Sequence, residues 1–288
     1  MNKNIVIEDY IAPIREILAD KGHDKKKNLR RLIYRARKIN SSHLQKSLTV
    51  DQTVERLLQP QWRAKIRRFD IDEWRRVAEN IRQRAVEYLG KAAPPEIITY
   101  PGFGRFNGRV YKLDGRPVIG CAPDFPRTSG DNLKVILAHE YAHFIRWQKT
   151  GVPPEKGPIY SFIYEEGWAT WLSIKLLPEL DINTMFMSNL HNMINMPNPR
   201  GGYIAWCRKN MDLIVTQAQK ALKSRDDKDI GRFFQCRRFK DDDTPIRVGY
   251  YLGYKLIETM AERYPPRQML LLRPKVSEIE ARLEKLRV

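Results

Sequence analysis

The chain has 288 residues, of which 42% are hydrophobic and 10% aromatic, and this composition excludes an intrinsically disordered protein. No apolar run approaches the roughly 18 residues of a membrane-spanning helix, and residues 1–23 lack the apolar core of a secretory signal. The cysteines are odd in number and far apart, which predicts reduced thiols and a cytoplasmic protein: Cys121, Cys207 and Cys236.

Residues 1–93 are predicted to form a basic, helical N-terminal region. The whole chain has a net charge of +18, and residues 1–91 hold 22 Lys and Arg against 12 Asp and Glu. Basic residues within Lys25–Lys38 would form a stripe along one helix, which can bind nucleic acid or an acidic protein. The alternative, which we favour, is a solvated helix face. A further helix over Ile71–Leu89 has an apolar face that must be buried, so this region is expected to be a packed subdomain.

Residues 94–200 are predicted to form the core of an α+β, mostly helical fold. Short strands joined by Gly-rich turns are expected near 97–100, 108–112 and 117–121, and we expect them to form a small antiparallel sheet. Two largely apolar helices follow, near 133–147 and 163–177. Residues 201–288 are predicted to be a helical C-terminal part that completes a cleft.

The first of these apolar helices contains the pattern H-E-x-x-H, formed by His139, Glu140 and His143. Histidines four residues apart lie about 40° from each other around a helix axis, so both imidazoles can reach one Zn²⁺. Glu140 lies about 100° from His139, close enough to hold a water on the metal without ligating it. Two ordinary core histidines, the main alternative, would not explain the glutamate between them. The pattern therefore predicts a zinc site.

A catalytic zinc site needs a third protein ligand. The extended pattern H-E-x-x-H-x-x-G-x-x-H is excluded, because Arg146 and Lys149 stand where it requires Gly and His. The second apolar helix begins with a carboxylate pair, Glu165 and Glu166. The spacing from His143 to this pair suits one helix, a reversing loop and a second helix packed against the first.

The H-E-x-x-H pattern followed by the run from Glu165 to Thr170 (EEGWAT) resembles the gluzincin metallopeptidases. It is most similar to bacterial families of predicted zinc-dependent proteases whose second motif is E-G-x-A. This resemblance covers about residues 95–265 and implies a zincin-like fold. It implies that Glu166, the glutamate before the glycine, is the third zinc ligand. Glu165 lies about 100° away around the helix, and we expect it to be a surface carboxylate that faces solvent or the cleft rim. It also implies that the strand at 118–122 forms the cleft edge and pairs with an extended peptide substrate.

A third similarity to these families is the G-Y-x-x-G pattern from Gly249 to Gly253. By motif position, Tyr250 and Tyr251 are the candidates to stabilise the oxyanion of the reaction, with Arg247 or His191 behind them. The alternative for each tyrosine is packing in the core or at the rim. Thr170 departs from the resemblance, because many relatives carry an acidic residue there that orients a zinc-bound histidine.

These observations predict a zinc-dependent peptidase, in which Zn²⁺ activates water and Glu140 is the general base. The expected partner is a peptide or protein substrate; the sequence indicates neither its identity nor an oligomeric state. Two alternatives from other classes stay open. One is a basic nucleic-acid-associated protein with a structural zinc site, and the other is a non-catalytic zincin-like binding scaffold.

Overall fold

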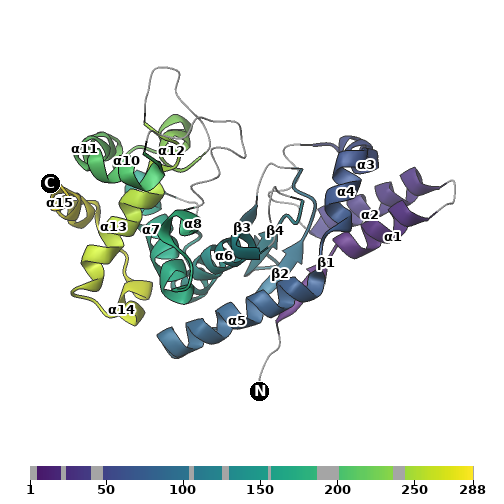
Figure 1. Ribbon diagram of the computed structural model, residues 1–288, viewed down its shortest axis with the longest axis horizontal. Helices are drawn as coiled ribbons and strands as arrows, with labels where there is room; N and C mark the ends of the chain where they lie inside the picture. The colour runs from purple at the N-terminus through teal and green to yellow at the C-terminus, as the bar shows by residue number, and fades with distance from the viewer. Residues whose placement is uncertain are drawn as a thin grey trace. The chain divides into compact units, whose positions relative to one another are not determined.

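The computed structural model describes residues 5–20, 24–39, 48–103, 107–124, 130–154, 157–186, 201–235 and 244–287 (Figure 1). Within these ranges the fold is α+β and mostly helical, with 14 helices and one four-stranded mixed sheet. The predicted fold class is therefore confirmed in its helical character, and the expected antiparallel sheet is wrong.

The chain divides into two compact units. The first comprises Met1–Arg84 and Ala92–Glu140, and the second comprises Ala85–Lys91 and Tyr141–Val288. Helix α6 (Gly130–Thr150) runs through the division and belongs to both. The three-part organisation with boundaries at 93 and 200 stays a prediction.

The first unit begins with a strand, β1 (Val6–Asp9), where only helices were expected. Five helices follow, and each turns apolar side chains inward: α1 (Ile11–Ala19), α2 (Lys25–Ile39), α3 (Val50–Leu58), α4 (Pro60–Arg67) and α5 (Ile71–Leu89). Most of the apolar face predicted for α5 is buried, at Trp74, Ala78, Ile81, Ala85 and Leu89, whereas Tyr88 of the same face is exposed. The burial of these residues agrees with the periodicity of α5, and an N-terminal subdomain over residues 1–93 stays a prediction.

The sheet has the order β1-β2-β4-β3, with β2 (Glu96–Thr99), β3 (Gly108–Leu113) and β4 (Arg116–Cys121). The pairs β1–β2 and β2–β4 are parallel, and only the β3–β4 hairpin is antiparallel. Helices α1–α5 connect β1 to β2, and such a long crossover is the connection that parallel strands need. The turn at Asp114 and Gly115 explains the antiparallel hairpin, because both residues have positive φ.

The strand expected to pair with substrate lies inside the sheet. Residues Val118–Cys121 belong to β4, whose two edges are taken by β2 and β3. The expectation that this strand forms the cleft edge is therefore wrong. The outer position next to β4 is occupied by β3.

The second unit is helical in its described part, and helix α7 (Ile159–Leu176) is its core. Fourteen residues of α7 are buried, so it has no solvent face comparable to that of a surface helix. The other helices are α8 (Ile182–Met185), α10 (Tyr203–Lys209), α11 (Met211–Ala221), α12 (Asp227–Phe234), α13 (Val248–Ala261), α14 (Pro266–Leu271) and α15 (Val276–Glu284). None of the helices within the described ranges has both the length and the apolarity to cross a bilayer.

Candidate metal centre

Helix α6 carries both histidines of the H-E-x-x-H pattern. It spans Gly130–Thr150, so the pattern lies well inside the helix, as predicted. The backbone N–H of Gly130 donates to Glu73 Oε1 of α5 at 3.3 Å, which satisfies one of the groups left open at a helix N-terminus. His139 is partly exposed, whereas Glu140 and His143 are buried. The pattern therefore has one side that is accessible and one that is enclosed.

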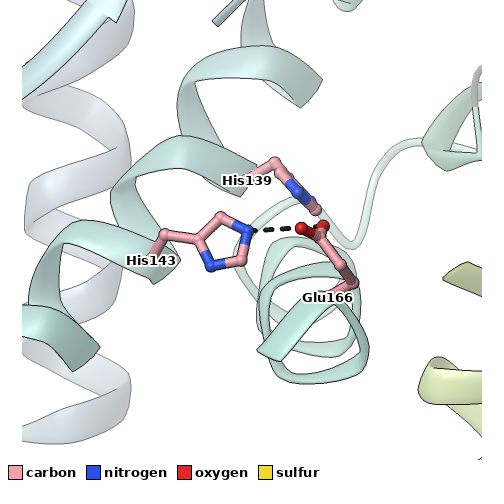
Figure 2. Close-up of side chains that lie close together, drawn as sticks. All are labelled: His139, His143 and Glu166. Carbon is pink, nitrogen blue, oxygen red and sulfur yellow. Dashed lines mark hydrogen bonds and ion pairs between the residues drawn. The ribbon is translucent and has the colours of Figure 1, made fainter. Parts of the chain in front are cut away.

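Helix α7 brings Glu166 to the two histidines. One ligand atom from each of His139, His143 and Glu166 lies within 4.8 Å of the others, and in Figure 2 the three side chains point toward one another. Trp168, two residues after Glu166, donates from Nε1 to the Ala142 carbonyl of α6 at 3.3 Å. The two helices are thus joined directly beside the cluster.

The geometry of this cluster fits a metal ion. His143 Nε2 and Glu166 Oε2 are 3.4 Å apart, which is longer than a typical N–H···O hydrogen bond. Two atoms that ligate a tetrahedral Zn²⁺ at about 2.0–2.1 Å would themselves be about 3.4 Å apart. The glutamate is only 6% exposed, and a carboxylate buried to that extent needs a cation or hydrogen-bond donors. The buried triad therefore fits an H-E-x-x-H…E site of the zincin type.

Glu140 lies against the first residue of β3. A Cβ atom added to Gly108 would be 2.7 Å from Glu140 Cγ and 3.1 Å from Glu140 Oε1. Only a glycine lets the strand approach the carboxylate so closely. Burial lowers the pKa of the neighbouring Arg109, and the negative charge of Glu140 opposes that shift. The sequence analysis missed Gly108, because its importance comes from contact with a residue 32 positions away.

Glu165 is a buried ion-pair partner, and the prediction that it faces solvent or the cleft rim is wrong. It is 4% exposed, and both of its oxygens accept hydrogen bonds from Arg146 Nε at 2.8 Å. Burial raises the pKa of the Glu165 carboxyl, and the charge of Arg146 opposes this shift. The sequence pattern around Arg146 only excludes the three-histidine type of site. The ion pair of Arg146 with Glu165 was therefore not predicted.

The glycines of the second and third motifs lie against each other. Gly167 directly follows Glu166 on α7, and Gly253 ends the G-Y-x-x-G pattern on α13. A Cβ on Gly167 would lie 2.3 Å from the Gly253 carbonyl oxygen, and a Cβ on Gly253 would lie 2.3 Å from the Ile163 carbonyl oxygen. The two motifs therefore form one close helix–helix contact, which supports α7 at the residue after Glu166.

Tyr250 and Tyr251 lie in aromatic surroundings at the start of α13. The Tyr250 ring packs edge-on to Phe234. The Arg247 guanidinium carbon lies over the same ring, 4.0 Å from the ring centroid. The Tyr251 ring packs against Phe186 and Tyr254. Burial raises the pKa of the Tyr251 phenol, with a hydrogen bond to Arg208 opposing the shift.

These contacts agree with packing for both tyrosines, and a role for either in stabilising an oxyanion stays a prediction. His191 lies outside the described residues. Thr170 is buried on α7, one turn after Glu166.

Comparison with protein-family models, with curated proteins and with solved structures gives no match for this chain. Inferences about function therefore depend on the site itself.

Proposed function

We propose that this protein is a zinc-dependent peptidase in which His139, His143 and Glu166 hold the metal. The observation that carries this proposal is the triad of two buried residues and the partly exposed His139, with ligand atoms within 4.8 Å of one another and Glu140 next in sequence to His139. Two imidazoles and one carboxylate make up a donor set of hydrolytic zinc sites, which leave a fourth position for water. Structural zinc sites are closed by four ligands, often thiolates.

The described cysteines do not favour the structural alternative. Cys121 and Cys207 are free and buried, and the metal-binding group found within the described residues contains neither. Burial raises the pKa of both thiols. The proposed site is therefore of the open, hydrolytic type.

The residues of the chain supply proton transfer and positioning. A Zn²⁺ ion bound in such a site lowers the pKa of a water ligand toward ~7 and polarises a carbonyl oxygen. Glu140 would accept a proton from the attacking water and donate it to the leaving amine. Gly108 supports this role, because its contact with the Glu140 side chain restricts the positions that the carboxylate can take.

The position of β3 supports an extended peptide as substrate. This strand is at the end of the sheet order, and its first residue contacts Glu140. An extended peptide can add to the edge of a sheet through backbone hydrogen bonds, which bind without selecting a sequence. A peptide placed along β3 would bring a backbone carbonyl toward Glu140.

The zinc content of the purified protein is the first test of the proposal. We expect about one zinc per chain in purified protein, measured by elemental analysis, and its loss in His139→Ala, His143→Ala and Glu166→Ala. His43→Ala is the matched control, because it removes a histidine that is not part of the triad. A peptide-library digest, analysed by mass spectrometry, should show cleavage by wild type and none by the three variants. Zinc retained by all three variants, or no cleavage by zinc-loaded wild type, would contradict the proposal.

A further inference from the structure

Arg146 and Glu165 form a buried ion pair directly beside the metal-site triad. Arg146 follows His143 by three residues on α6, and Glu165 precedes Glu166 on α7. The two side chains are 3% and 5% exposed, and the guanidinium Nε donates to both carboxylate oxygens at 2.8 Å. One contact between charged groups therefore joins the two helices that supply the metal ligands.

The same guanidinium holds the end of a third helix. Its Nη1 donates to the carbonyls of Met269 and Leu270, and its Nη2 donates to the carbonyl of Leu272 at 2.7 Å. These carbonyls lie at the C-terminal end of α14, where backbone acceptors are only partly satisfied by the helix, and that of Met269 also accepts from the Leu272 N–H at 3.2 Å. The Tyr164 hydroxyl also donates to the Met269 carbonyl, at 2.7 Å. Arg146 is thus fixed by several acceptors, and its Nε in turn holds Glu165.

A contribution to stability does not by itself explain two buried charges. Removing a charged pair from water costs several kcal/mol per ion, and well-packed apolar residues of similar size often serve equally well or better. What the pair adds is a defined geometry. The single Nε N–H is shared between both oxygens of Glu165, so the side chain of Glu165 is held toward Arg146 of α6.

Rotation matters because α7 presents two glutamates in succession. Neighbouring residues on a helix point about 100° apart, so only one of Glu165 and Glu166 can face the histidines. With Glu165 bound to Arg146, Glu166 is the residue within ligand distance of His143. We propose that the Arg146–Glu165 pair is a positioning device that selects Glu166 as the third metal ligand. This inference rests on the proposed function only in requiring that the triad binds a metal.

The test is the zinc affinity of variants that lack the pair. Arg146→Met with Glu165→Met removes both charges and keeps two unbranched side chains, but it also takes the guanidinium donor from the α14 carbonyls, so the apo protein should be less stable to heat than wild type and is compared where it is folded. Its dissociation constant for Zn²⁺, measured by competition with a chromophoric chelator, should rise about 10- to 100-fold, as when other groups that orient metal ligands are lost. The absorption spectrum of the Co²⁺-substituted protein should change as well, because it reports ligand geometry.

Tyr164→Phe is the matched control, since it removes a hydrogen bond to the same carbonyl of Met269 and leaves the ion pair in place. It should leave the zinc affinity unchanged. Arg146→Lys keeps the charge but loses the planar guanidinium. If the double variant does not fold, the zinc affinity and Co²⁺ spectrum of Arg146→Lys test the inference in its place. Wild-type zinc affinity and Co²⁺ spectrum in the folded variants would overturn this inference alone. Zinc binding by wild type without peptide cleavage would overturn the proposed function alone, and a wild type without zinc would overturn both.

Discussion

At the scale of single residues, the contact between Glu140 and Gly108 connects the metal helix to the sheet. The carboxylate is 8% exposed, and the glycine approaches it more closely than any side-chain-bearing residue could. A buried general base needs a fixed position, because a proton moves efficiently only over hydrogen-bond distances. Gly108 and the helix together restrict the carboxylate, which agrees with its proposed role.

The variant Glu140→Gln tests this role. The amide has the same shape but cannot accept a proton from water, so we expect zinc content close to wild type and kcat lowered by a factor of at least ~10². Glu87→Gln is the control, because it makes the same change at an exposed position of α5. Steady-state kinetics on a cleaved peptide, with zinc content measured on the same samples, gives both readouts. Turnover near that of wild type would remove Glu140 from the reaction.

The residues of the site differ in how far the sequence could predict them. His139 and His143 are related by helical spacing alone, and the structure confirms that both reach one cluster with Glu166. The burial of Glu165 could not be read from local pattern, because its partner Arg146 is 19 residues away on another helix. The E-G-x-A resemblance selected Glu166 over its neighbour, whereas the ion pair of Glu165 depends on how α6 and α7 pack together.

At the scale of elements, the contact between α7 and α13 explains why glycine occurs in both downstream motifs. Gly167 and Gly253 allow the two backbones to touch, and each would lose this contact with even a methyl group added. Since Glu166 precedes Gly167, a displacement of α7 at this point would move the third ligand away from the histidines. A contact between helices thus supports the position of Glu166 in the candidate metal site.

We therefore expect Gly167→Ala and Gly253→Ala each to lower the free energy of unfolding by about 1–3 kcal/mol, the usual cost of overpacking a core. Both should also weaken zinc binding, because α7 must shift. Ser173→Ala is the control, since it lies on the same helix and adds no atom. Denaturant unfolding and chelator competition measure the two effects. Wild-type values for both alanine variants would show that the close approach is not required.

The sheet shows where reasoning from local pattern failed. The strands near 97–100, 108–112 and 117–121 and the hairpin between the last two were correctly predicted, because turn residues and alternation are local signals. The parallel pairing was not, since β2 pairs with β4 and with β1, which is separated from it by five helices. Strand order is decided by contacts distant in sequence, which short-range patterns do not encode.

At the scale of the molecule, the positive charge of the N-terminal helices is partly balanced within the fold. Two bases of α2 contact acids of α3, in the pairs Lys26–Glu55 and Arg30–Asp51. All four side chains are at least half exposed, so these pairs contribute little stability. They do lower the charge that this face presents to an anionic partner, and they favour the interpretation of the basic stripe of α2 as a solvated helix face.

Strand β1 ties this N-terminal region to the sheet. Val6–Asp9 pairs in parallel with Glu96–Thr99, and the Thr99 hydroxyl donates to Asp9 Oδ1 at 2.7 Å. Deleting residues 1–91 would remove β1 and leave that edge of β2 without its partner, and unprotected edges promote aggregation. The apolar surface that α5 covers would be exposed as well. The region is thus expected to be required for folding, which a separate nucleic-acid-binding arm would not be.

Truncation and DNA titration distinguish a basic region required for folding from a nucleic-acid-binding arm. Protein lacking residues 1–91 should be insoluble or should unfold at a lower temperature, as measured by size-exclusion chromatography and thermal denaturation. Full-length protein should show no tight binding to duplex or single-stranded DNA at ~150 mM salt, where charges are screened beyond ~8 Å. Fluorescence anisotropy of labelled DNA measures the binding at ~150 mM and at ~20 mM salt. Weak binding found only at the lower salt would reflect the net charge of the protein alone. Tight binding at ~150 mM salt, together with a soluble and active truncated protein, would instead establish the N-terminal helices as a nucleic-acid-binding region.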